Sequence, residues 1–221
     1  MKKIVLFMMM LLCSLSMNAQ WSVTPEVGVI GFQKINYKDD WTFAPKLGLG
    51  IEYQFSPLFS LQSGGYYMQR GYWFDGSPIM SENKEYVEII SGDLNRHYLQ
   101  IPLLAKFSWN VGDDVRLSLG AGPYMAFCIA KDVENNLTRY EVTDNNGYNY
   151  AGTSLSPKKN QFDHLRSFDW GLTASAGLEV KQWVVNFSYD LSLGKEYKRD
   201  LVNPNYHTFS LSVGYKFKFG R

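Results

Sequence analysis

This sequence contains little of what most soluble or helical membrane proteins rely on. It has two cysteines, Cys13 and Cys128, and the first lies in a segment that we expect to be removed, so no internal disulfide can form in the mature chain. Beyond residue 19, no apolar run approaches the roughly 20 residues that a membrane-spanning helix needs. Loss of residues 1–19 leaves 20 basic and 21 acidic residues, so no net field favours nucleic acid or anionic lipid as a partner.

The usual catalytic and metal-binding patterns are also missing. The three histidines, His97, His164 and His207, show no short metal-ligand spacing, and we assign them to rim or loop positions. Residues 144–147 lack the later Glu that a calcium loop requires, and no Gly-x-Ser-x-Gly or phosphate-binding pattern occurs. We therefore predict no catalytic residues, no metal site, no cofactor and no enzymatic activity.

The N-terminal segment has the form of an export signal. Two lysines precede the apolar stretch 4–15, and a cleavage site follows Ala19. This stretch is too short to span a bilayer as a helix. A lipoprotein signal ending at Cys13 is the alternative, which the large residue before the cysteine disfavours. We predict a cleaved signal peptide at residues 1–19 and a single outer-membrane β-barrel domain at residues 20–221.

What the chain does contain is an alternation of apolar and polar residues over eight stretches. The last stretch shows it most clearly, with apolar or aromatic side chains at every second position from Phe209 to Phe219 and small or charged ones between them. Successive side chains of a strand point to opposite faces, so each stretch has one apolar and one polar wall. We expect strands at residues 22–33, 43–55, 59–73, 96–111, 115–127, 168–180, 183–193 and 208–219.

The links between these stretches are alternately long and short. Tight turns follow the second, fourth and sixth stretches, at residues 56–58, 112–114 and 181–182, whereas polar loops are expected at 74–95 and 129–166. Outer-membrane barrels have short periplasmic turns and long extracellular loops. We predict an all-β fold, an eight-stranded antiparallel up-and-down transmembrane β-barrel in the bacterial outer membrane, with periplasmic termini and extracellular long loops.

A soluble lipocalin-like binding barrel also alternates, but its apolar wall faces inward. Two observations favour an apolar outside. The polar wall is rich in Gly, Ser and Thr, as a narrow interior requires, and aromatic residues gather near the ends of the stretches, as at the two interfaces of a membrane. Four acidic and four basic residues on the polar wall are predicted to form a structural ion-pair network in the lumen: Glu26, Lys46, Glu52, Arg70, Lys106, Arg116, Glu179 and Asp190.

Eight strands enclose a space just wide enough for their own side chains, so we expect this network to plug the lumen. The leading hypothesis is a non-enzymatic, monomeric barrel in outer-membrane lipid that displays its long loops to an extracellular or envelope protein partner. A small pore, or an accessory of secretion or transport, is the alternative. The residues expected to bind the partner, or otherwise to anchor the rim, are Tyr72, Trp73, Tyr140, Tyr148 and Tyr150.

Four segments carry a family resemblance: YLQIPLLAKF at 98–107, GAGPY at 120–124, FDWGLTASAGLE at 168–179 and LSVGYKF at 211–217. They resemble the PorT-like outer-membrane β-barrel family, eight-stranded barrels of the OmpX/OmpA type, and the similarity covers nearly the whole mature chain. The resemblance implies an outer-membrane barrel. Most family members have no assigned activity, and the name-giving member is linked to protein secretion. Such barrels often end on an aromatic residue, whereas two further residues follow Phe219 here.

Overall fold

The described part of the chain consists of β-strands and the links between them. The computed structural model describes residues 20–34, 41–75, 78–81, 85–142, 148–155, 166–194 and 205–219. The predicted signal peptide, residues 144–147, His164 and the chain end at 220–221 lie outside these residues. Among the residues described, no helix is long and apolar enough to cross a membrane.

The described residues form eleven strands in one antiparallel sheet. They are β1 (Gln20–Lys34), β2 (Thr42–Gln54), β3 (Phe59–Asp75), β4 (Ile79–Met80), β5 (Tyr86–Asn110), β6 (Val115–Val142), β7 (Tyr148–Leu155), β8 (Phe168–Val180), β9 (Trp183–Ser192), β10 (Tyr206–Tyr215) and β11 (Phe217–Phe219).

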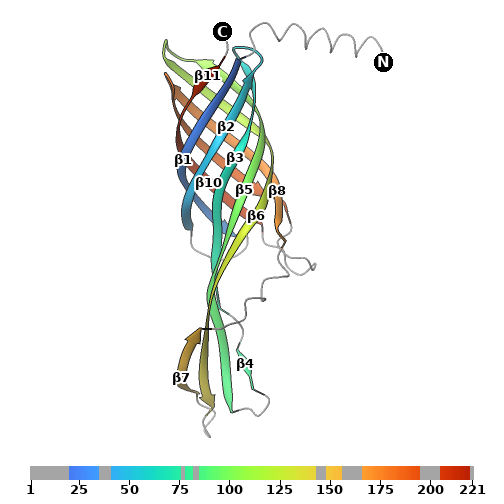
Figure 1. Cartoon of the computed structure of the whole chain (residues 1–221), viewed down its shortest axis with the longest axis vertical. Coiled ribbons are helices and arrows are strands. Elements are labelled where there is room, and N and C mark those ends of the chain that lie inside the picture. The colour runs from blue at the N-terminus through green and yellow to red at the C-terminus, as the bar shows by residue number, and fades with distance from the viewer. Residues whose placement is uncertain are drawn as a thin grey trace, which may run out of the picture.

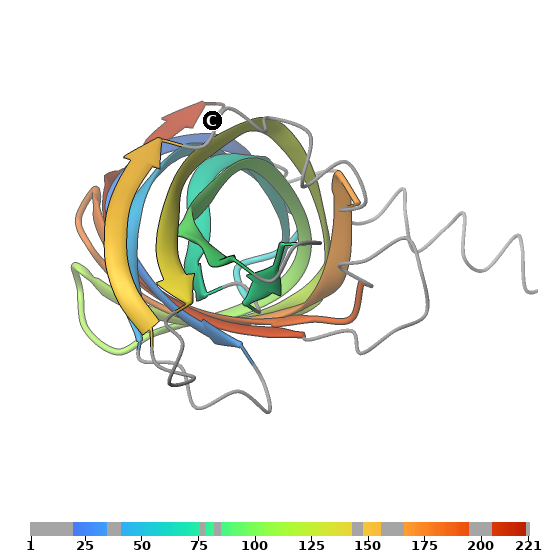
Figure 2. The ribbon, with the colours of Figure 1, turned by 90° about the horizontal axis from the view of Figure 1, so that it is seen from below.

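Eight of these strands close into a barrel. Their order is β5-β3-β2-β1-β10-β9-β8-β6, and the pairing of β5 with β6 completes the ring, which Figure 2 shows end-on. The predicted eight-stranded antiparallel barrel is confirmed. The last predicted strand is interrupted at Lys216, whose backbone N–H donates to the carbonyl of Gln182 at 2.7 Å, and β11 then continues along β1.

The apolar side chains of the barrel wall point outward. In β10, for example, Phe209 and Leu211 are exposed on the outer surface while Ser210 and Ser212 are buried inside. This is the opposite of a lipocalin-like binding barrel, so the soluble alternative is wrong. An apolar outer wall meets lipid, as outer-membrane barrels require.

Aromatic rings form a belt at the short-turn end of the barrel. Trp21, Tyr53, Phe55, Phe59 and Phe107 make consecutive ring contacts, with centroid separations of 4.7, 4.6, 5.7 and 5.4 Å. Aromatic side chains favour the boundary between lipid and water because they present an apolar body with a polar or polarisable edge. The belt therefore marks one membrane interface.

The predicted polar loops at 74–95 and 129–166 are wrong over much of their length. Strand β3 ends at Asp75 and β5 begins at Tyr86, while β6 continues to Val142. These strands pair with one another beyond the barrel, so hydrogen bonds between the strands satisfy their backbone groups. The strands β4 and β7 pair with the outer edges of this ribbon.

We call this projecting ribbon the extension and define it as residues 71–75, 78–81, 85–95, 130–142 and 148–155. Figure 1 shows it as a long twisted sheet below the barrel. The opposite end of the barrel carries the short turns, and there Trp21 pairs with Phe219 while Gln20 pairs with Gln54. Both ends of the described chain therefore lie at the rim away from the extension.

Candidate functional site

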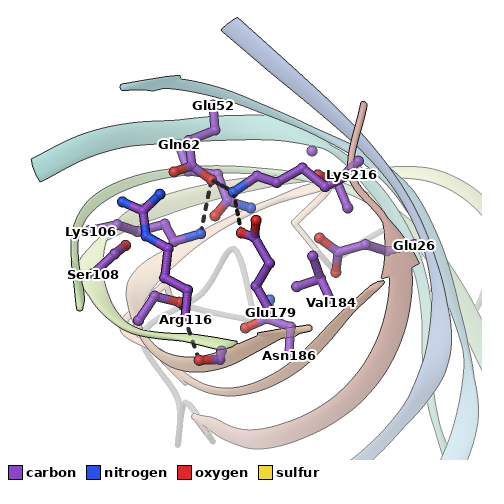
Figure 3. Close-up of a pocket in the computed structure, with 14 residues that line it drawn as sticks. Glu26, Glu52, Gln62, Lys106, Ser108, Arg116, Glu179, Val184, Asn186 and Lys216 are labelled. Atoms are coloured by element: carbon purple, nitrogen blue, oxygen red, sulfur yellow. Dashed lines mark hydrogen bonds and ion pairs between the residues drawn. The ribbon is translucent and has the colours of Figure 1, made fainter. Parts of the chain in front are cut away.

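The lumen near the short turns holds a chain of five charged side chains, which we call the ion cluster: Lys106, Glu52, Lys216, Glu179 and Lys218. The Lys216 Nζ lies 3.0 Å from a carboxylate oxygen of Glu52 and 3.0 Å from one of Glu179. Lys106 reaches Glu52 at 3.1 Å, and Lys218 reaches Glu179 at 2.6 Å. Figure 3 shows most of these side chains converging from opposite walls.

The ion cluster follows from strand alternation, because each member occupies an inward position of a different part of the barrel. Glu52 lies on β2, Lys106 on β5 and Glu179 on β8, and Lys216 lies at the break between β10 and β11. Buried charges are costly unless each finds a partner, and here every carboxylate has two cations within reach. The space left between the lining side chains is about 20 Å³, which is room for about one water molecule.

A second charged group lies deeper in the lumen, toward the extension. The Arg70 guanidinium on β3 donates to Asp169 on β8 at 2.8 Å. The Tyr124 hydroxyl and the Ser192 hydroxyl donate to the same carboxylate at 3.1 and 2.7 Å. Arg70 also lies over the ring of Tyr98, 5.6 Å from its centroid. The carboxylate of Asp169 thus has three side-chain donors from three parts of the wall.

Four of the predicted network residues bind neutral groups rather than opposite charges. Lys46 donates to the Ser210 hydroxyl at 2.9 Å, and Glu26 accepts from the Ser212 hydroxyl at 2.8 Å. Asp190 accepts from Thr173 and Gln100 at 2.8 and 3.2 Å. Arg116 donates to the side-chain oxygen of Gln54 and to the carbonyl of Pro57.

The predicted ion-pair network left out four further charged residues of the lumen and its rim, although strand alternation puts three of them on the polar wall: Arg96, and the three polar-wall residues Asp169, Lys216 and Lys218. With them, the charges on this wall become seven cations and five carboxylates, instead of four of each sign. Lys216 and Lys218 occupy polar positions of the alternating last stretch, so the pattern that located the strand contained the signal.

An apolar cluster fills the lumen at the level of the Arg70–Asp169 pair, where the Tyr98 and Tyr124 side chains contact that pair. Its members are buried side chains that point inward from β1, β3, β5, β6 and β10: Ile30, Phe32, Met68, Tyr98, Tyr124, Ala126 and Tyr206. We call it the apolar cap. Sequence analysis did not predict it, because these seven residues were assigned to neither wall. The cap fills the lumen with carbon where a conducting path would need water.

The residues predicted to bind a partner lie in strands of the extension rather than in irregular loops. Tyr72 and Trp73 belong to β3, where they pair with Leu94 and Asp93. Tyr148 begins β7 and pairs with Val142.

Tyr140 on β6 and Tyr150 on β7 are direct cross-strand partners, with ring centroids 6.0 Å apart. The structure brings this pair together. Tyr72 and Trp73 enter the extension on a different strand, β3, which pairs with β5 and not with β6 or β7.

The histidines take positions near the rim that carries the extension. His97 Nδ1 lies 2.6 Å from the Tyr67 hydroxyl, and its Nε2 lies 2.8 Å from a carboxylate oxygen of Asp132. His207 contacts the Tyr189 hydroxyl in a similar Tyr–His pair. These contacts tie neighbouring strands together at the level where the barrel meets the extension.

Comparison with known proteins agrees with this architecture. A family model described as an outer membrane protein beta-barrel domain matches residues 14–198. No curated protein matches the chain. Among solved structures, the chain is similar to Ail, the attachment invasion locus protein of Yersinia pestis, with 16% identity, a TM-score of 0.43, and coverage of 91% of this chain and 100% of that chain.

Two other solved barrels show a comparable likeness. For Neisserial surface protein A the identity is 13% and the TM-score 0.43, over 90% of this chain and 99% of that chain. For the outer membrane protein OprG from Pseudomonas aeruginosa the identity is 10% and the TM-score 0.43, over 91% and 97%. These values describe a likeness in chain path and carry no information about activity.

Proposed function

Because this chain belongs to the outer membrane protein beta-barrel domain family, we propose that it is a non-enzymatic outer-membrane barrel with a closed lumen, whose extension is displayed to a protein partner outside the cell. The observation that carries the proposal is the contrast between the two ends of the molecule. The lumen is filled by its own side chains, whereas the extension projects a long ordered sheet beyond the barrel.

The contents of the lumen support a closed barrel. From the short-turn end inward, a water-filled path would have to pass the ion cluster, in which only about 20 Å³ remains free, and then the apolar cap. Apart from Lys216, at the break between β10 and β11, every member of the two obstacles lies in a strand. Eight-stranded barrels have interiors that side chains can fill.

The sidedness of the barrel follows from the general rule for bacterial outer-membrane barrels. Short turns are periplasmic and long connections are extracellular. We accordingly place both termini in the periplasm and the extension outside the cell. A monomer in outer-membrane lipid, without nucleic-acid partners, fits the closed ring of strands and the low net charge.

A finer family placement is also part of the proposal. The segments at 98–107 and 168–179 motivate a PorT-like membership, which would associate the chain with protein secretion. A small pore or secretion accessory therefore stands as the second candidate. The seven cations against five carboxylates on the inner wall are the observation that favours it, because such an excess would attract anions.

Deletion of residues 133–160 is expected to abolish capture of the partner. The deletion removes β7 and the outer end of β6, and with them Tyr140, Tyr148 and Tyr150, while the barrel part of β6 remains. Cells that produce the intact or the shortened protein are treated with a surface crosslinker, and the crosslinked species are recovered and compared. Partner species recovered with the intact protein should be missing with the shortened one.

The matched control deletes residues 196–203. They belong to the link between β9 and β10, two strands whose linked ends are at the rim that carries the extension. This variant should retain the partners. Heat-modifiable migration on gels must show that both shortened proteins are folded. Identical partners for the intact protein and the variant lacking 133–160 would defeat the display hypothesis.

A further inference from the structure

The tip of the extension has an apolar groove on one face of its sheet. Its lining residues come from the segment before β4 and from β4, β5 and β6: Pro78, Met80, Val87, Ile89 and Tyr140. We call it the tip groove. Its volume is about 350 Å³, near the lower end of pockets that hold small ligands and enough for one or two large apolar side chains.

One row of side chains crosses four strands at this groove. Met80 pairs with Val87, Val87 with Tyr140, and Tyr140 with Tyr150. Residues directly opposite each other in an antiparallel sheet share a face, so the row is continuous. In this row, Met80 is 49% exposed and Tyr150 is 65% exposed. Exposed apolar surface of this kind is costly to leave in water and commonly marks an interaction site.

The opposite face of the same sheet is charged. Arg139 donates to a carboxylate oxygen of Glu88 at 2.6 Å and lies over the ring of Tyr86, 4.4 Å from its centroid. The hydrogen bond with Glu88 raises the pKa of the Arg139 guanidinium above its usual value. The sheet at the tip is therefore amphipathic, and only one of its faces is suited to apolar contact.

The backbone holds the tip groove in shape. The Ser81 hydroxyl accepts hydrogen bonds from the backbone N–H groups of Glu85 and Tyr86 at 3.1 and 3.3 Å. The Ser81 N–H donates to the Tyr86 carbonyl at 2.9 Å, and the Val142 N–H donates to the Glu85 carbonyl at 2.8 Å. These bonds fix β4 against β5 and β5 against β6, so a ligand would meet a preformed groove.

The extension carries an excess of negative charge. Its described residues include seven carboxylates and two basic side chains: Asp75, Glu85, Glu88, Asp93, Asp132, Glu134 and Glu141, with Lys131 and Arg139. Arg139 is already paired with Glu88. Within the part of the chain that the structure describes, no cation pairs with Glu85, which directly precedes β5 at the tip, or with Glu141, which lies opposite Tyr86 on the charged face of the sheet. A complementary ligand must bring positive charge.

We propose that the tip groove binds a cationic segment of a partner protein that inserts an apolar or aromatic side chain between Met80, Val87 and Tyr140. This rests on the proposed display function and specifies the chemistry of the partner. The inserted side chain supplies the affinity by leaving water. Lysine or arginine residues on either side of it face the carboxylates of the extension, which speeds the encounter and selects against acidic segments.

The test uses the full-length barrel in nanodiscs of phosphatidylcholine and a fluorescein-labelled peptide in which a Phe-Leu pair stands between Lys-Ser repeats. Fluorescence anisotropy measures its dissociation constant, with empty nanodiscs as the blank. Two further peptides serve as comparisons. In the Glu peptide every lysine is replaced by glutamate, and in the other peptide Phe-Leu is replaced by Ser-Ser. We expect the Lys peptide to bind at least about 10-fold more tightly than either of them, and added salt to weaken it.

Two substitutions of the same residue type give the matched comparison. Tyr140→Ser opens the floor of the groove and should weaken binding by about 10-fold, whereas Tyr86→Ser, on the charged face of the neighbouring strand, should change it by less than about 2-fold. Met80→Ser, on the edge strand, should repeat the loss. Both tyrosine variants must show heat-modifiable migration; if Tyr140→Ser does not fold, Met80→Ser replaces it in the comparison.

The groove proposal is overturned if the Lys and Glu peptides bind equally well, or if the Tyr140 and Tyr86 variants behave alike. Those outcomes are distinguishable from failure of the display function. If the protein lacking 133–160 loses its crosslinked partners but the peptides show no preference, display stands and the groove chemistry does not. If that protein keeps all partners, display itself is wrong.

Discussion

Asp169→Asn is expected to destabilise the folded barrel by about 3–5 kcal/mol, because it leaves the buried Arg70 guanidinium without its counter-charge. The substitution keeps the size of the side chain, so packing is nearly unchanged. The substitution removes the carboxylate that accepts a hydrogen bond from Arg70 Nη1 at 2.8 Å. Among the described residues, no other carboxylate is bonded to Arg70. The Arg70 side chain is 3% exposed and cannot turn to water.

Denaturant-induced unfolding in phosphatidylcholine vesicles, followed by tryptophan fluorescence, measures this loss. The matched control is Asp114→Asn, which removes a carboxylate at the short turn, 3.9 Å from the Lys181 ammonium, where both side chains are largely exposed. The control should lose less than about 1 kcal/mol. If the two variants are equally stable, the Arg70–Asp169 pair does not help to hold the lumen together.

Gly122→Ala is expected to destabilise the barrel by about 3 kcal/mol, at the upper end of the effects of overpacking. Gly122 lies on β6 where this strand pairs with β5, a contact that we call the β5–β6 seam. A Cβ built there would stand 2.0 Å from the carbonyl oxygen of Leu103 and 3.2 Å from the Cα of Leu104, so β5 itself would have to move. The ladder between β5 and β6 is already interrupted here, between the pairs Pro102–Tyr124 and Ala105–Ala121.

The control for this substitution is Gly65→Ala on β3. A Cβ at Gly65 would meet only the end of the Leu99 side chain, at an ordinary contact distance of 3.7 Å. This variant should be as stable as the parent or slightly more so, because alanine restricts the unfolded chain. The same unfolding assay measures both. Equal stability of the two variants would mean that the seam can spread without cost.

The barrel could be predicted from the sequence because strand alternation is a local pattern. Every second residue of the last stretch, from Phe209 onward, is apolar, and the structure has those side chains on the outer wall. The lengths of the links gave the order of the strands, since up-and-down topology leaves few alternatives. Both signals need only neighbouring residues, so no long-range contact had to be known.

The extension could not be predicted in the same way. In residues 86–95 and 130–142, Asn, Asp and Glu are interspersed with apolar residues, without the sustained alternation of the barrel strands. They form strands because β5 and β6 lie side by side at the seam and continue to pair beyond the barrel. That pairing joins residues far apart in the sequence, such as Tyr86 and Glu141, and no local pattern encodes it.

The lumen shows both what alternation can predict and where it fails. It placed Glu52, Lys106 and Glu179 on one wall, but it could not tell which cation each carboxylate would meet across the barrel. The apolar cap was not predicted, for a different reason. Ile30 and Phe32 lie four and six positions after the inward Glu26 and so on the same side of β1, but the sequence analysis assigned them to neither wall. Strand alternation alone would have placed both side chains inside the barrel.

Single-channel recording tests the closed lumen most directly. Purified protein with heat-modifiable migration is inserted into planar lipid bilayers in concentrated KCl, and the current is recorded at both polarities. With the ion cluster and the apolar cap in place, the barrel should insert without producing stepwise currents. Reproducible current steps from the folded, unmodified protein would contradict the closed lumen and favour the pore.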